Sequence, residues 1–131
     1  MSELTQSDID KIFKKPGEKR YEYFLKKAVE AEEVFGLADE EGWALLGDDS
    51  DADILPIFPA AAFAEAFRHA AEFDEYQVEV LDINELMAWL EDMEKDALLI
   101  AVFPNPDLNG AVVEPKHLKA DLQKEFDKAV E

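Results

Sequence analysis

The chain has 131 residues, of which 48% are hydrophobic and 11% aromatic. This composition differs from that of disordered chains, and the length is that of one ordinary domain, so we expect a single folded unit. The absence of cysteine excludes disulfides, cysteine metal clusters and thiolate nucleophiles. The first ten residues do not resemble a secretory signal, and no apolar run approaches the roughly 20 residues of a membrane span. We therefore expect a cytoplasmic protein.

The net charge is -19, from 32 acidic and 13 basic residues. The excess lies in residues 28–96, which contain 21 acidic residues and only Arg68 and Lys95 as bases. Such a block repels nucleic acid phosphates and anionic lipids and attracts basic partners. We expect a basic protein as partner, if there is one, and no nucleic acid or membrane. The alternative interpretation is a charge that serves only solubility or a salt-rich host.

The N-terminal segment is predicted to be an arm that carries one short helix. Ser7 and Asp10 predict the helix cap, and a Pro-Gly pair ends the pattern. Over residues 18–33 the apolar side chains recur at helical spacing, which predicts an amphipathic helix. The predicted boundaries are residues 1–17 for the arm and 18–131 for a single α+β domain.

A predicted β-hairpin follows over residues 34–46, with its turn at 39–42. Residues 54–58 read as a third strand, and Pro56 predicts that this strand lies at a sheet edge or carries a bulge. A helix is expected from Pro59 to about residue 72.

The second half begins with a strand over residues 76–80, where apolar and polar residues alternate. Asp82 and Glu85 then form a predicted capping box that opens a helix. Residues 97–103 are continuously apolar, which predicts a strand covered on both faces at the centre of the sheet. A short strand over 111–113 and a C-terminal helix complete the chain.

These elements indicate an α+β fold in a single domain. We expect a mainly antiparallel mixed sheet of about six short strands, with helices on both faces. Two stretches, Val34–Phe73 and Ala97–Phe126, share the order strand, turn, strand and helix. They predict an architecture built from two similar units.

No motif with specific chemistry stands out. The turn Asp49–Asp53 resembles the start of a calcium-binding loop, but Ile54 replaces the required glycine and Ala60 the required glutamate. Both histidines, His69 and His117, lie beside the apolar stripes of their helices. We therefore predict no catalytic, cofactor-binding or metal-binding residue, and no cofactor. The acidic residues are too numerous for sequence to single out a catalytic pair.

Five segments occur in the order that characterises one bacterial family. They are Arg20–Lys27, Gly42–Leu46, Leu55–Pro59, Ala101–Pro104 and Val112–Pro115. Over about residues 20–126 the chain resembles the family known as domain of unknown function 2750. The resemblance implies a small stand-alone bacterial protein, and it assigns no role to any residue.

Two functional hypotheses remain open. The first is a non-enzymatic binding or regulatory protein whose acidic middle block engages a basic protein. Its candidate partner-binding residues lie in two turns and are Asp48, Asp49, Asp51, Asp53, Glu72, Asp74 and Glu75. The second is a small-molecule-binding domain or enzyme, with a site near Phe103, Pro104 and Trp43. Solvated turns without a function are the alternative interpretation of the acidic residues.

Overall fold

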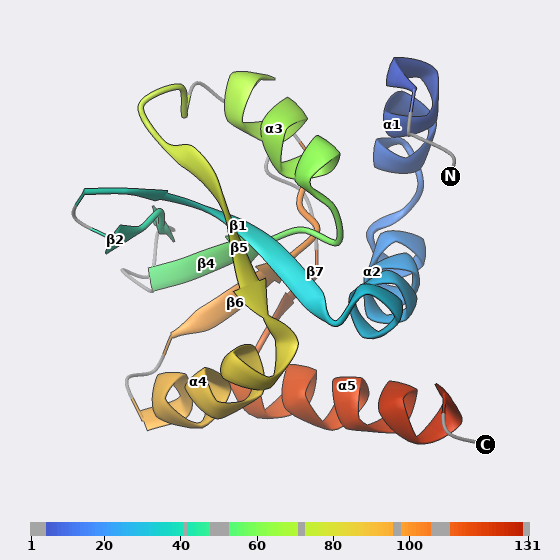
Figure 1. The fold of residues 1–131 in the computed structure, drawn as a ribbon, viewed down its shortest axis with the longest axis vertical. Coiled ribbons are helices and arrows are strands. Elements are labelled where there is room, and N and C mark those ends of the chain that lie inside the picture. The colour runs from blue at the N-terminus through green and yellow to red at the C-terminus, as the bar shows by residue number, and fades with distance from the viewer. Residues whose placement is uncertain are drawn as a thin grey trace.

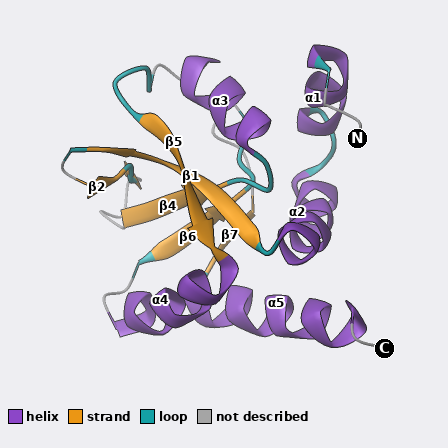
Figure 2. Ribbon diagram, in the orientation of Figure 1, coloured by secondary structure: helices purple, strands orange, loops and turns teal. Residues whose placement is uncertain are grey.

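The computed structural model describes residues 5–40, 42–47, 53–70, 73–95, 98–105 and 111–129 (Figures 1 and 2). The helices of these ranges are α1 (Gln6–Phe13), α2 (Gly17–Ala31), α3 (Ala61–Ala70), α4 (Ile83–Lys95) and α5 (Pro115–Ala129). The strands are β1 (Glu33–Asp39), β2 (Gly42–Trp43), β3 (Leu46–Gly47), β4 (Asp53–Ile57), β5 (Gln77–Asp82), β6 (Leu99–Val102) and β7 (Ala111–Val113).

The strands form two small sheets within one α+β domain. One sheet has the order β2-β1-β5 and is antiparallel throughout. The other has the order β3-β4-β6-β7, in which only β4 and β6 run parallel. Two backbone hydrogen bonds between Phe35 and Phe58 join β1 to the end of β4. The predicted α+β class is confirmed, with its strands divided between two sheets.

Helices cover the strands from opposite sides. In Figure 1, α3 lies above the strands, and α4 and α5 lie below them. α2 flanks the strands at one side, and α1 continues the same flank. Between these layers lies one apolar core, whose largest buried side chains include five phenylalanines, Phe24, Phe58, Phe63, Phe67 and Phe103.

The central placement of the apolar strand is confirmed. β6 has β4 on one side and β7 on the other, and Ile100 is fully buried. The expectation that Pro56 marks an edge strand or a bulge is wrong, because β4 lies inside its sheet and pairs with β6 in a continuous register through Pro56. The Ile57 carbonyl accepts from the amide of Phe103, the residue that follows β6, so the backbone groups of the neighbouring Pro56 point away from β6. On that side β3 pairs only with Asp53 and Ile54, and the missing amide interrupts no ladder.

Helix starts and the proposed repeat differ in detail from the sequence prediction. α1 is capped by Thr5, which exchanges hydrogen bonds with Asp8, rather than by Ser7. Asp82 does cap α4, accepting a hydrogen bond from the Asn84 amide at 2.8 Å. The two similar units are matched only loosely, because the second arm of the first hairpin is divided. Its first part, β2, pairs with β1, and its last part, β3, pairs with β4.

The Trp43 ring packs on the backbone of β1 at Gly36. A side-chain carbon added at Gly36 would lie 2.8 Å from the Trp43 ring, so the indole rests directly on the glycine backbone. The Trp43 ring also contacts that of Trp89 of α4, with the ring centroids 5.8 Å apart. In the described part of the chain, no helix is long and apolar enough to cross a membrane.

Candidate functional site

Antiparallel pairing brings acidic residues together at one end of β1 and β5. Ala38 is paired with Gln77, so the turn after β1 lies beside the start of β5. The carboxylates that the structure describes in these segments are all exposed. We call this group the acidic end, and it consists of Asp39, Glu40, Asp74, Glu75 and Glu79.

A surface hollow of about 840 Å³ lies within the acidic end. Four carboxylates contribute to its lining, which otherwise consists of Ala38, Tyr76 and Gln77. Among the residues that the structure describes, no lysine, arginine or histidine lines it. The carboxylates therefore face a shared volume of solvent in which a positively charged group would be attracted by several of them at once.

Two basic residues of α3 hold the turn that leads into β5. Arg68 Nη1 donates to the carbonyl oxygens of Asp74, at 3.0 Å, and Tyr76, at 3.3 Å. Its guanidinium also pairs with Glu65, a hydrogen bond that raises the pKa of Arg68. His69 Nδ1 lies 3.2 Å from a carboxylate oxygen of Asp74. Because Arg68 is already engaged with Glu65 and two carbonyls, it fixes the shape of the turn.

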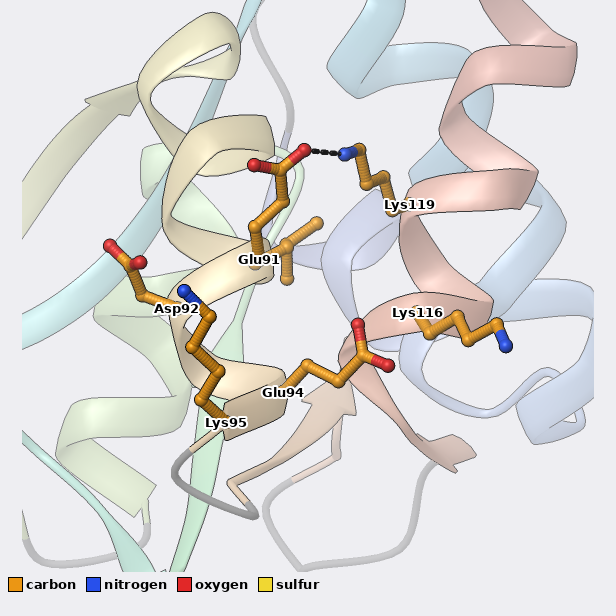
Figure 3. Close-up of a pocket in the computed structure, with 7 residues that line it drawn as sticks. Glu91, Asp92, Glu94, Lys95, Lys116 and Lys119 are labelled. Atoms are coloured by element: carbon orange, nitrogen blue, oxygen red, sulfur yellow. Dashed lines mark hydrogen bonds and ion pairs between the residues drawn. The ribbon is translucent and has the colours of Figure 1, made fainter.

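A second hollow, between α4 and α5, has a different electrostatic character (Figure 3). It measures about 730 Å³. Three acidic and three basic side chains balance one another along its walls, and Glu91 forms an ion pair with Lys119 across it. This hydrogen bond and the charge of Lys119 lower the pKa of Glu91. The arrangement connects two helices and leaves no net charge for a ligand. The charged lining residues are Glu91, Asp92, Glu94, Lys95, Lys116 and Lys119.

The structure describes three of the seven predicted partner-binding residues. Asp74 and Glu75 are exposed and belong to the acidic end. Asp53 is exposed at the start of β4. In Figure 1, α3 runs back from the end of β4, and the start of β4 lies on the same side of the molecule as the β1-β2 turn. The other four, Asp48, Asp49, Asp51 and Glu72, lie outside the described residues.

Sequence reasoning missed three members of the acidic end. Asp39 and Glu40 were assigned only to a hairpin turn, and Glu79 to the wet face of a strand. The signal that could have found them is the pairing of β1 with β5, which places the start of one strand beside the end of the other. Two alternating strands can pair in several registers, so the pattern alone does not give this neighbourhood.

The second predicted location, around Phe103, is a packed core. Phe103 is fully buried, and its ring contacts those of Phe13, Tyr23, Phe58 and Phe63 at centroid distances of 4.7 to 6.4 Å. Trp43 belongs to a different ring contact, with Trp89. The described rings around Phe103 thus fill the space that a ligand would need.

One set of polar side chains connects α2 to α5. Tyr21 donates its hydroxyl to Asp121, and His117 Nε2 lies 3.2 Å from the same carboxylate oxygen. Burial, together with the hydrogen bond and charge of Asp121, raises the pKa of Tyr21. His117 is largely exposed and sits one helical turn before Asp121. The geometry holds two helices together. Among the described residues, no group of three or more acidic or histidine side chains could hold a metal ion.

A family model described as "Protein of unknown function (DUF2750)" matches residues 21–122. The chain belongs to the DUF2750 family. The match extends from the second residue of the Arg20–Lys27 segment into α5, so it includes both sheets and the acidic end. No curated protein matches the chain. The description of the DUF2750 family names no activity and assigns no role to any residue.

Proposed function

We propose that this DUF2750 protein is a non-enzymatic binding protein that engages a basic protein partner through its acidic end. One observation carries the proposal: four carboxylates, from Asp39, Glu40, Glu75 and Glu79, line one hollow, and no basic side chain of the described part of the chain lines it. Electrostatic complementarity of this kind raises association rates and selects partners by charge. The proposal places the encounter in the cytoplasm.

The distribution of basic residues supports this choice of surface. Eleven of the 13 bases lie in residues 11–27 and 116–128, that is, in α1, α2, α5 and their connections. Figure 1 shows α1 and α2 on the side of the molecule opposite the β1-β2 turn, and α5 below the strands. Residues 1–27 and 97–131 together contain 11 basic and 11 acidic residues, so a basic partner is attracted mainly toward the acidic end, which orients it before contact. Asp53 adds an exposed carboxylate on the attractive side. The candidate partner-binding residues also include Asp48, Asp49 and Asp51, which precede it in the sequence.

The experiment compares two variants that lose the same charge at different places. The first carries Asp39→Asn, Glu40→Gln, Glu75→Gln and Glu79→Gln. The control carries four neutralised exposed carboxylates from other elements, Glu18→Gln, Asp92→Asn, Glu94→Gln and Glu114→Gln. Binding of a fluorescent lysine-rich peptide is measured by anisotropy over a range of sodium chloride concentrations.

The acidic-end variant should bind the peptide at least about tenfold more weakly than the control variant, and its affinity should depend less on salt. Circular dichroism checks that both variants keep the wild-type fold. Equal weakening in the two variants would show that only net charge matters, and it would remove the acidic end as a binding site.

A further inference from the structure

β5 is an edge strand whose outer side is open in the described part of the chain. It pairs with β1 over six consecutive residues, from Glu33 opposite Asp82 to Ala38 opposite Gln77. The register has no bulge, and β1 separates β5 from β2. Of its side chains, Val80 is 53% exposed, one of the largest exposures of a hydrophobic side chain in the described chain.

The hydrogen bonds of β1 identify which backbone groups of β5 point outward. Phe35 exchanges two backbone hydrogen bonds with Phe58, and the Leu37 carbonyl accepts from Ala44. The backbone amide and carbonyl groups of Phe35 and Leu37 therefore point away from β5. Because these groups alternate in direction along a strand, those of the adjacent residues in β1 point toward β5. The partners of those neighbours in β5 are Gln77, Glu79 and Leu81. It follows that Val78 and Val80 direct their amide and carbonyl groups to the open side.

Edge strands normally carry features that prevent pairing with another chain, such as lysine, proline or a bulge. β5 has none of these, and its charges, on Glu79 and Asp82, are all negative. A second copy of this protein would bring the same charges to the edge, within a molecule whose net charge is -19. The charges thus disfavour self-pairing and favour a strand that carries lysine or arginine.

We propose that β5 accepts an extended basic segment of a protein partner as an added strand of the β2-β1-β5 sheet. This inference rests on the proposed function and adds its binding mode. Backbone hydrogen bonds from Val78 and Val80 would provide affinity, and alternate side chains would provide specificity. Glu79 points to one face of the sheet and Val80 to the other. The added strand therefore has a basic residue opposite Glu79 and an apolar residue opposite Val80.

The test uses peptides of roughly ten residues, the length of an extended strand. The first peptide alternates lysine and valine, and the second contains the same residues in an order without alternation. A third alternates glutamate and valine. Affinity is measured by calorimetry, and amide hydrogen exchange of Val78 and Val80 is followed by NMR with and without each peptide.

Val80→Pro provides the protein variant, because it removes an outward amide and leaves the hydrogen bonds to β1 in place. Its matched control is Val80→Ala, which keeps the amide and shortens the side chain. Val80→Pro should weaken binding of the alternating basic peptide at least about tenfold, and Val80→Ala should weaken it less. If Val80→Pro does not fold, amide exchange at Val78 and Val80 of the wild-type protein decides whether the peptide pairs with β5.

The proposal requires the alternating basic peptide to bind at least about tenfold more tightly than its rearranged isomer and to slow exchange at Val78 and Val80. The glutamate peptide should not bind. Equal binding of both basic peptides without slowed exchange would overturn strand addition and leave the proposed function standing. Failure of both basic peptides to bind would overturn both. A wild-type dimer that Val80→Pro abolishes would also overturn it, by showing that the edge pairs with a second copy.

Discussion

Arg20 connects three parts of the chain through one side chain. It is only 3% exposed, and its Nε donates to the Phe103 carbonyl at the end of β6 at 3.0 Å. Its Nη1 donates to the carbonyl oxygens of Phe13, at 3.0 Å, and Lys15, at 2.5 Å, at the end of α1. Phe103 has a φ of 52°, which is strained for a bulky residue, and both its amide and its carbonyl are hydrogen-bonded there. Arg20 therefore stabilises an unfavourable backbone conformation and attaches the N-terminal helix.

Arg20→Lys should destabilise the protein although the positive charge is kept. A single ammonium group cannot reproduce the fork that reaches Phe103 and Phe13 together, and at least one buried carbonyl loses its donor. We expect a loss of about 1 to 3 kcal/mol in the free energy of unfolding, measured with urea. Amide exchange in α1 should also become faster. An unchanged midpoint with unchanged exchange in α1 would contradict this role.

Tyr21→Phe tests the contact between α2 and α5 through pH. The pKa of Tyr21 is raised in the folded protein, so its contribution to stability is fully present below the unfolded pKa of about 10. As the pH rises above 10, the unfolded tyrosine ionises first, and this contribution is lost. The stability difference between wild type and variant, measured with urea from pH 8 to 11, should therefore shrink above pH 10. The same difference at pH 8 and 11 would show that the Tyr21 hydroxyl is not held by Asp121.

At the scale of elements, β6 is the strand on which both neighbours depend. Ile100 is fully buried, and Leu99 at the start of the strand is only partly buried. Ile100→Ala should cost about 2 to 5 kcal/mol, because it removes buried methyl groups and leaves a cavity. Leu99→Ala is the matched control and should cost less. Equal midpoints for Ile100→Ala and wild type in urea unfolding would show that the buried Ile100 side chain of β6 does not contribute to stability.

The elements that could be predicted are those whose burial leaves a pattern in sequence. β6 is covered on both faces, so its apolar run is continuous, and α2 has one buried face with helical spacing. The pairing of β1 with β5 has no such pattern, and this pairing assembles the acidic end. The burial of Arg20 also leaves no pattern in the sequence, because a buried arginine cannot be told there from the neighbouring surface lysines. Two of the five residues of the acidic end, Asp74 and Glu75, were therefore predictable as members of an acidic turn, and the other three required the register.

At the scale of the whole molecule, the charge asymmetry should affect stability. Residues 28–96 carry 21 acidic residues, and the folded state brings several of them together at the acidic end. Salt screens exposed charges over about 8 to 10 Å at physiological ionic strength. The melting temperature should therefore rise when sodium chloride is increased from low to moderate concentration, as calorimetry would show. A decrease would mean that attractive pairs, such as Glu91 with Lys119, outweigh the repulsion.

The parallel pairing of β4 with β6 also constrains how the chain folds. Residues paired across it, such as Ile54 and Leu99, are far apart in sequence, and the chain between them contains α3, β5 and α4. That same excursion supplies β5 to the other sheet. Contacts between distant residues form late, because a long loop must close before they are gained. The β3-β4-β6-β7 sheet cannot be completed before this excursion returns to β6, whereas all strands of the β2-β1-β5 sheet precede residue 83. The contacts between β4 and β6 should therefore form after those between β1 and β5.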